Sequence, residues 1–165
     1  EILNQLNFQS PYVELPKKMT VQQNLFFYSR LYGLKNFKDV VEKLSCDLNI
    51  ENLLNRSYGS LSAGQKTKVN LCKALLNKPK LLLLDEPTAS LDPETSIFIR
   101  NYLMDYKNKN KSSILITSHN LDEIKTVCSN IVLLKSGEIV AQGKIKNVLD
   151  NYKFNNLIEF FLTKG

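Results

Sequence analysis

Two runs of apolar residues predict neighbouring strands of a parallel sheet. Residues 81–84 are four leucines, and this run ends abruptly in the adjacent carboxylates Asp85 and Glu86. Residues 114–117 form the next strand, and Ser118 and His119 follow it directly. A parallel strand covered on both faces reads as a continuous apolar run, and ligands bind beyond the carboxyl ends of such strands. We therefore expect a functional site at these side chains. The alternative is that Asp85 and Glu86 are solvated acids at the end of a core strand.

Apolar residues at helical spacing predict helices before and between these strands. Thr20 and Gln23 form a capping-box pattern, Ser62 is a good N-cap, and Asp92 followed by Pro93 starts a further helix. The apolar positions of the successive helices are Val21, Leu25, Tyr28 and Tyr32; Val40, Val41, Leu44 and Leu48; Val69, Leu71, Cys72, Leu75 and Leu76; and Ile97, Ile99, Leu103 and Met104.

The end of the chain predicts a hairpin and helices. Residues 131–134 and 139–142 flank a short polar turn that contains Gly137, which is typical of a hairpin or a closely spaced pair of strands. The remaining residues read as one or two helices. Together with the predicted parallel strands, this pattern favours an α/β fold.

Composition and charge narrow the possible partners. The chain has 165 residues, of which 43% are hydrophobic, and a formal charge of +6 from 22 basic and 16 acidic residues. The basic residues are scattered except over residues 107–111, where they predict a solvated loop. Nucleic acid is not expected as a partner because basic and aromatic residues do not alternate along one face. Attraction to anionic lipid headgroups stays open.

The cysteines and the hydropathy indicate a cytoplasmic chain. Cys46, Cys72 and Cys128 are odd in number and far apart, so we expect neither a disulfide framework nor a zinc site. No apolar run approaches the roughly 20 residues that a membrane-spanning helix needs. A reducing cytoplasm fits these features best.

Four motifs in order resemble those of the ATP-binding cassette (ABC) ATPases. They are the sequence LSAGQ at residues 61–65, the leucines and carboxylates at residues 81–86, Ser90-Leu91-Asp92, and His119. In that family they would be the signature motif, the Walker B strand with its catalytic glutamate, the D-loop and the switch histidine. A single five-residue match is weak evidence, whereas four in order and at matching spacing are specific.

The resemblance implies a magnesium and ATP site. Asp85 would hold Mg²⁺ through its water shell, Glu86 would act as general base toward the attacking water, and His119 would contact the γ-phosphate of ATP. Gln9 lies where the family has its Q-loop glutamine, which reaches the magnesium and the water and senses the membrane part of the transporter. The loop after Gln9 is about two residues longer than expected, and an ordinary loop amide is the alternative.

The resemblance also implies a head-to-tail dimer with a second ABC ATPase subunit. Ser62, Ala63, Gly64 and Gln65 would contact ATP held by that partner, and Asp92 would lie in the D-loop at the interface. Ala63 replaces the more usual glycine of the signature motif. Without the resemblance, Ser62 and Asp92 are explained as helix caps.

The implied fold is a partial P-loop NTPase core of the ABC ATPase type, with a mostly parallel sheet and an inserted helical subdomain. Residues 10–75 would contain the Q-loop, the helical subdomain and the signature helix. Residues 76–165 would contain the second half of the catalytic core and the C-terminal helices.

The phosphate-binding loop of this class is not found in these residues. Its pattern is Gly-x-x-x-x-Gly-Lys-Ser/Thr, known as Walker A. Gly59 and Gly64 have the right interval, but Gln65 stands where lysine is required. We therefore expect the chain to be the distal part of a longer protein, to be marginally stable or self-associating alone, and to bind ATP poorly without it.

The leading hypothesis is the ATP-hydrolysing subunit of an ABC transporter, at the inner face of the cell membrane and bound to an integral membrane permease. The segments around residues 10–13 and 19–21 look most similar to subunits of exporters. One alternative is a soluble ABC ATPase of DNA repair or translation. The other is a non-catalytic truncated cassette that binds a permease or a sister ATPase. The resemblance implies an ATPase, but because Walker A is not found, the chain alone is expected to hydrolyse ATP negligibly, and its standing as an enzyme stays open.

Overall fold

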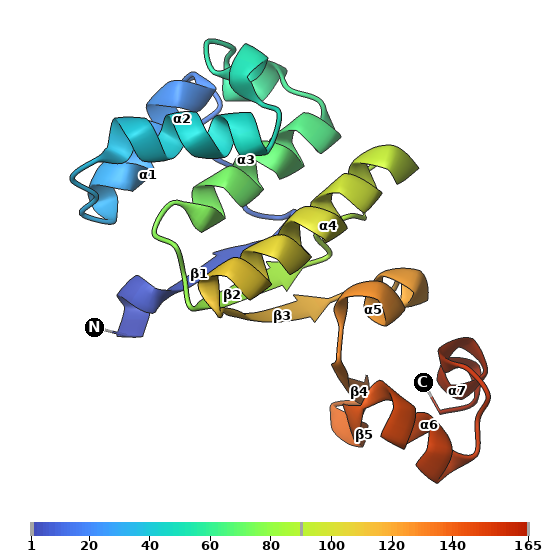
Figure 1. Cartoon of the computed structure of the whole chain (residues 1–165). Helices are drawn as coiled ribbons and strands as arrows, with labels where there is room; N and C mark the ends of the chain where they lie inside the picture. Colours follow the sequence, from blue (N-terminus) through green and yellow to red (C-terminus); the bar gives the residue numbers. More distant parts are fainter. Residues whose placement is uncertain (1, 90, 165) are drawn as a thin grey trace. The chain divides into compact units, whose positions relative to one another are not determined.

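The computed structural model describes residues 2–89 and 91–164. It contains two compact units, Glu1–Thr117 and Ser118–Gly165. The first unit holds a sheet and most of the helices, and the second holds a hairpin with three short helices. Figure 1 labels the elements of both units.

A parallel sheet organises the first unit. Its strands are β1 (Leu6–Gln9), β2 (Leu81–Asp85) and β3 (Ser113–Thr117). They pair in the order β1-β2-β3, so the strand of leucines is central. The register places Gln9 beside Leu84 and Asp85 beside Thr117. The parallel strands expected from the sequence are confirmed, and their carboxyl ends share one edge of the sheet.

One face of the sheet carries the core of this unit. Leu82 and Leu84 of β2 share a buried cluster with Ile99 and Leu103 of the long helix α4 (Pro93–Asn110). On the opposite face, Leu115 of β3 is 60% exposed. The expectation that these strands are covered on both faces therefore does not hold within the described residues, because an aliphatic run alone does not distinguish one covered face from two.

A group of helices precedes β2 in the first unit. Its members are η1 (Ile2–Gln5), α1 (Val21–Leu31), α2 (Phe37–Asp47), η2 (Glu51–Leu53), η3 (Tyr58–Ser60) and α3 (Ala63–Leu75), the η elements being single 3₁₀ turns. Figure 1 shows α1 and α2 beside α3. The capping box predicted at Thr20 and Gln23 is present, and Ser62, predicted as an N-cap, forms a second capping box with Gln65. Each box satisfies backbone donors that a helix start otherwise leaves unpaired.

The second unit confirms the predicted hairpin. Its elements are α5 (Leu121–Val127), β4 (Asn130–Lys135), β5 (Glu138–Lys144), α6 (Ile145–Tyr152) and α7 (Leu157–Lys164). Strands β4 and β5 are antiparallel, and Ser136 and Gly137 in the turn have φ values of +52° and +84°. Two successive positive φ values fit the turn types that join twisted hairpins. Val148 and Phe160 are among the buried residues that form this unit's own core.

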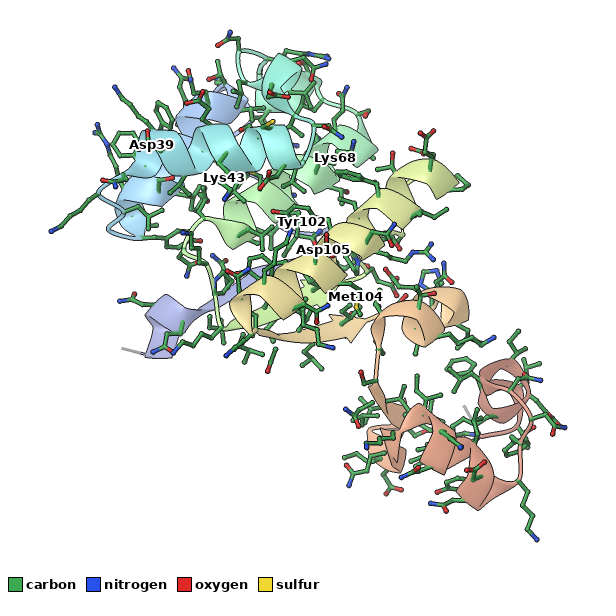
Figure 2. The ribbon with its side chains drawn as sticks, viewed as in Figure 1. Asp39, Lys43, Lys68, Tyr102, Met104 and Asp105 are labelled. Atoms are coloured by element: carbon green, nitrogen blue, oxygen red, sulfur yellow. The ribbon has the colours of Figure 1, made fainter. Side chains whose placement is uncertain are left out.

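Charged side chains lie on the exposed faces of α2 and α4 in the first unit. Figure 2 shows Asp39 and Lys43 on α2, and Asp105 on α4. Between α3 and α4, the Lys68 ammonium lies 5.4 Å from the ring centroid of Phe98. In the part of the chain that the structure describes, every helix is too short or too polar to cross a membrane.

The helical group predicts a matched pair of substitutions on α1. Leu25 is fully buried and Leu31 is 66% exposed. Leu25→Ala should lower the free energy of unfolding by about 2–5 kcal/mol, because it removes buried methyl groups and leaves a cavity. Leu31→Ala, the same change on the same helix, should cost less than about 0.5 kcal/mol. Urea unfolding followed by circular dichroism measures both; equal losses would show that Leu25 is not a core residue.

Candidate functional site

Asp85 ends β2 and is held by hydroxyl groups from both neighbouring strands. Ser10, directly after β1, donates its hydroxyl to Asp85 Oδ2 over 2.9 Å. Thr117, the register partner of Asp85 on β3, donates its hydroxyl to Oδ1 over 2.6 Å. Because each carboxylate oxygen receives a donor, the side chain is fixed in one orientation at the edge of the sheet.

Glu86 follows Asp85 in an unusual backbone conformation. Its φ is +48°, in the left-handed region that residues other than glycine rarely adopt. The conformation is held by a hydrogen bond of 3.0 Å from the Glu86 backbone N–H to the Thr117 carbonyl, and by one of 3.2 Å from the Ala89 N–H to the Glu86 carbonyl. Strained backbone of this kind is concentrated at functional sites, where the surrounding structure holds it. Strand β2 ends at Asp85, directly before this residue.

The chemistry of this edge suits a hard divalent cation. Carboxylate and hydroxyl oxygens are the ligand types that Mg²⁺ prefers, and Mg²⁺ usually keeps several waters and binds one or two carboxylates together with substrate phosphates. Over residues 2–89 and 91–164, no three His, Cys, Asp or Glu side chains gather into a metal site. Asp85, with Ser10 and Thr117 beside it, therefore fits an ion whose other ligands are water and phosphate, and not a closed structural metal site.

Gln9 lies on the other face of the sheet from Asp85. Side chains alternate between the faces along a strand, and register partners in neighbouring strands share a face. Gln9 pairs with the buried Leu84, so its side chain is on the helix-covered face and is only 4% exposed. The structure places Gln9 beside the site, but its side chain points away from the Asp85 carboxylate.

The start of α3 combines the signature-like residues with a capped helix. The Gln65 backbone N–H donates to Ser62 Oγ over 3.3 Å, and the Ser62 N–H donates to Gln65 Oε1 over 3.1 Å. Ser62 and Ala63 are exposed. A Cβ at Gly64 would lie 3.4 Å from the Leu91 side chain, an ordinary contact. The packing of the described residues therefore does not itself require glycine there.

Asp92 caps α4 as the sequence predicts. Its Oδ1 accepts the Thr95 backbone N–H over 2.8 Å, and this hydrogen bond is the main reason that the pKa of Asp92 lies below its usual value. Leu91 lies beside the start of α3 through its approach to Gly64. Ser90, the first residue of the D-loop-like motif, lies outside the described residues.

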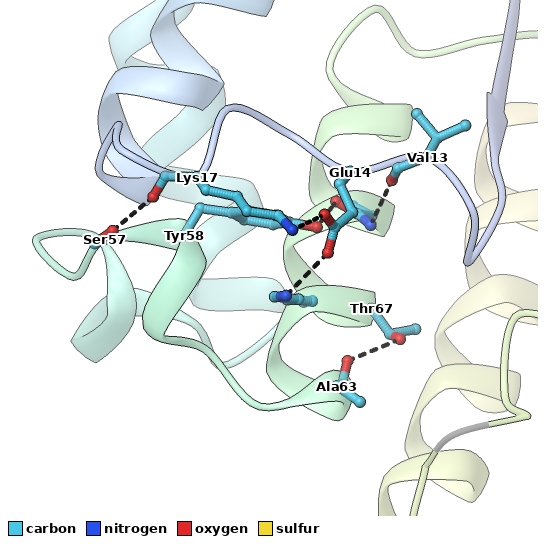
Figure 3. A network of polar contacts seen from close by, with 9 residues as sticks. Val13, Glu14, Lys17, Ser57, Tyr58, Ala63 and Thr67 are labelled. Atoms are coloured by element: carbon cyan, nitrogen blue, oxygen red, sulfur yellow. Dashed lines mark hydrogen bonds and ion pairs between the residues drawn. The ribbon is translucent and has the colours of Figure 1, made fainter.

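The loop after β1 is tied to α3 by several polar contacts (Figure 3). Lys66 of α3 pairs with Glu14 over 3.1 Å. Asn70, one turn further along α3, donates to the Val13 carbonyl over 3.3 Å and accepts from the Tyr58 hydroxyl over 3.1 Å. The segment that follows Gln9 is therefore fastened to the helix that carries the signature-like residues.

His119 lies at the start of the second unit and is exposed. The residues around it form the start of α5: Asn120 caps the helix by accepting the Glu123 N–H over 3.2 Å, and Ser118 Oγ donates to Glu123 Oε2 over 2.6 Å. Glu123 is almost fully buried. The cap at Asn120 fixes the backbone beside His119.

Ser10 and Thr117 were not predicted as partners of Asp85. They could be recognised only from the parallel register, which brings the ends of both strands beside β2 to the Asp85 carboxylate. Lys73, a charged residue in the apolar face of α3, was not predicted either. A lysine among the core positions of a helix was the available signal, since lysine is rarely buried.

The cap at Asp92 predicts a pH effect on stability. Because the pKa of Asp92 is lower in the folded state, the cap stabilises the fold at pH values above the unfolded pKa of about 4. That contribution is lost as the pH falls through the folded-state pKa. Asp92→Asn keeps an oxygen that accepts the Thr95 N–H but does not titrate, so its melting temperature should fall less between about pH 5 and pH 2. Glu94→Gln removes a neighbouring exposed carboxylate and should retain the wild-type pH profile; identical profiles for wild type and Asp92→Asn would contradict the assignment.

Comparison with known proteins finds matches over half of this chain or more. A family profile described as ABC transporter matches residues 4–89. The chain is 32% identical over 149 residues to the ABC transporter ATP-binding protein NatA of Bacillus subtilis strain 168, which covers 89% of this chain and 60% of NatA. It is 41% identical over 124 residues to the tungstate uptake system ATP-binding protein TupC of Peptoclostridium acidaminophilum, which covers 74% of this chain and 58% of TupC.

A solved structure supports the fold. A protein described as the ATP-binding subunit of an ABC transporter superposes with a TM-score of 0.88 at 24% sequence identity, over 97% of this chain and 68% of that chain. At this identity the likeness establishes the fold alone. The chain spans 60% and 58% of the lengths of NatA and TupC. From the profile match and the shared α/β architecture, we conclude that this chain belongs to the ABC transporter family and contains part or all of an ATP-binding domain of the ABC ATPase fold.

Proposed function

We propose that this chain carries the water-activating and partner-sensing residues of an ATP hydrolysis site, in the ATP-hydrolysing subunit of an ABC transporter. The observation that carries the proposal is the edge of the sheet at β2, where Asp85 is held by Ser10 and Thr117 and is followed by Glu86 in a strained turn. Two adjacent carboxylates with different surroundings can take two different roles.

The proposed mechanism divides the work between these carboxylates. Phosphoryl transfer to water depends on positioning and electrostatics more than on covalent chemistry. Asp85 would hold Mg²⁺, and this ion supplies charge neutralisation at the transferring phosphoryl group. Glu86 would accept the proton of the attacking water at its carboxylate as general base. Gln9 would orient that water and report nucleotide occupancy to the permease, and His119 would contact the γ-phosphate of ATP.

The start of α3 would serve the opposite site of a head-to-tail dimer. Backbone N–H groups at a helix start and the positive end of the helix dipole attract phosphate. Ser62, Ala63, Gly64 and Gln65 lie at this start, and Asp92 lies at the start of α4. These residues would contact ATP bound by a second ABC ATPase subunit. Within this proposal, residues 10–75 contain the Q-loop, helical subdomain and signature helix, and residues 76–165 contain the second half of the core.

An integral membrane permease is the proposed partner, which places the chain in the cytoplasm at the inner face of the membrane. The names of the relatives support this partner, because NatA and TupC are described as the ATP-binding proteins of a transporter and of an uptake system. We propose export as the direction from the likeness of residues 10–13 and 19–21 to exporter subunits. The uptake role in TupC's name makes import the alternative.

A second candidate function is a non-catalytic module that binds a permease or a sister ATPase. One observation favours it: these 165 residues contain no Gly-x-x-x-x-Gly-Lys-Ser/Thr sequence. Glu86 and His119 argue against it, because a non-catalytic binding module has no chemical need for these two residues. A soluble ABC ATPase of repair or translation is less well supported, because the relatives named above serve transport.

The general-base role predicts the effect of Glu86→Gln in the protein expressed from its complete coding sequence. The amide cannot accept the proton of the attacking water, so hydrolysis should fall by at least about 100-fold while ATP binding persists. ATP should therefore remain trapped and unhydrolysed on the protein, as measured by filter binding and phosphate release. Glu94→Gln, an exposed change on α4, is the matched control and should leave turnover unchanged; unchanged turnover in Glu86→Gln would remove Glu86 from this role.

The 165-residue chain by itself should bind ATP weakly. The phosphate-binding loop pattern is not in its sequence, and the helix start at α3 would contact nucleotide held by another subunit. Isothermal titration with Mg-ATP should detect no tight one-to-one complex and no hydrolysis. A tight stoichiometric complex would show that these residues do contain the main phosphate-binding site.

A further inference from the structure

A lysine is buried between α3 and β1. Lys73 is 9% exposed, and its Nζ donates a hydrogen bond to Asn7 Oδ1 over 3.2 Å. The same Nζ lies 5.1 Å, 5.3 Å and 5.9 Å from the ring centroids of Phe8, Tyr28 and Tyr32. Aromatic faces stabilise a cation at these distances. The ammonium is thus held by rings and an amide rather than by an acid.

The hydrogen bonds around Lys73 do not use all three N–H donors of its ammonium group. Asn7 Oδ1 also accepts the Phe8 backbone N–H over 2.9 Å and the Tyr32 hydroxyl over 3.4 Å, so three donors share an oxygen with two lone pairs. No carboxylate among the described residues forms an ion pair with Lys73. An ammonium group has three donors, and a buried one is costly unless they are used.

Gln9, by contrast, has an acceptor oxygen that lacks a hydrogen-bond donor. Its side chain is buried, and no donor in residues 2–89 or 91–164 reaches its Oε1. A cavity of about 30 Å³ is lined by both Gln9 and Lys73, together with Ser10, Tyr28 and Asn70 among others. This volume is large enough for a water molecule. A water there can accept from the Lys73 ammonium and donate to Gln9 Oε1, which satisfies both groups at once.

The position of this cavity matters for the proposed hydrolysis. Gln9 is on the face of Leu84, whereas Asp85 and Thr117 are on the other face at the end of the sheet. Gln9 must therefore turn out of the cavity before its side chain can reach a water near Asp85. Any interaction that favours the buried position lowers the fraction of molecules in which Gln9 is available.

We propose that Lys73 is a positioning residue that holds Gln9 withdrawn, through one water molecule that bridges Lys73 Nζ and Gln9 Oε1. The proposal rests on the proposed role of Gln9 in hydrolysis. Ser10 connects the two positions, because it lines the cavity and donates to Asp85. Lys73 thereby limits hydrolysis in the absence of the permease without touching ATP.

Lys73→Met tests this in the complete protein, because it keeps the length of the side chain and removes the charge. Basal kcat should rise about three- to tenfold with little change in the KM for ATP, the size of shift that one net hydrogen bond supports. Lys73→Arg keeps the cation and should retain the wild-type rate. In a Gln9→Ala background, Lys73→Met should have no effect on the residual rate. Lys43→Met on the exposed face of α2 is the matched control (Figure 2).

A nucleotide-free crystal structure gives a readout that does not depend on hydrolysis. Wild type should show a water within hydrogen-bond distance of both Lys73 Nζ and Gln9 Oε1, and Lys73→Met should show Gln9 turned out of the cavity. If Lys73→Met instead lowers kcat, and by the same factor in the wild-type and Gln9→Ala backgrounds, Lys73 has a purely structural role and the proposal is overturned. A Gln9 side chain that stays buried in Lys73→Met overturns it as well. If Glu86→Gln remains fully active while the bridging water is seen, the proposed function fails and the Lys73 site stands as a structural finding.

Discussion

The parallel pairing of β2 between β1 and β3 is the constraint on which the rest of the first unit depends. This pairing brings the ends of three segments that are far apart in sequence to one edge of the sheet. The hydroxyls of Ser10 and Thr117 meet the Asp85 carboxylate because of it, and the backbone of Glu86 is anchored on Thr117. A one-residue slip in register would move Asp85 to the other face and separate it from both hydroxyls.

Two neighbouring residues at the end of β1 have different contacts. Ser10 donates to Asp85 and also lines the cavity, whereas Gln9 is buried in that cavity, which Lys73 lines too. The fold thus places a residue of the proposed site and a buried cation within one short segment. The contacts of Glu14 with Lys66 and of Val13 with Asn70 tie the following loop to α3, the helix that carries the signature-like residues.

Local features were the most predictable from sequence. The capping box at Thr20, the N-caps at Ser62 and Asp92 and the hairpin turn at Ser136 depend on short-range chemistry, which the residue types specify. The hydrogen bonds from Ser10 and Thr117 to Asp85 were not predictable, because they depend on the register of three strands. Nor was the withdrawn position of Gln9, since a glutamine at a strand end looks the same on either face. The roles of Glu86, His119 and the signature-like residues stay proposals drawn from motif order.

The most direct test is a crystal structure of the complete protein with Mg²⁺ and a non-hydrolysable ATP analogue. The account predicts that the water shell of the metal contacts Asp85, that Glu86 accepts a hydrogen bond from the water aligned with the γ-phosphate, and that Gln9 has left the Lys73 cavity. A structure in which another carboxylate holds that water, or in which Asp85 remains bonded only to Ser10 and Thr117 and away from the metal, would contradict it.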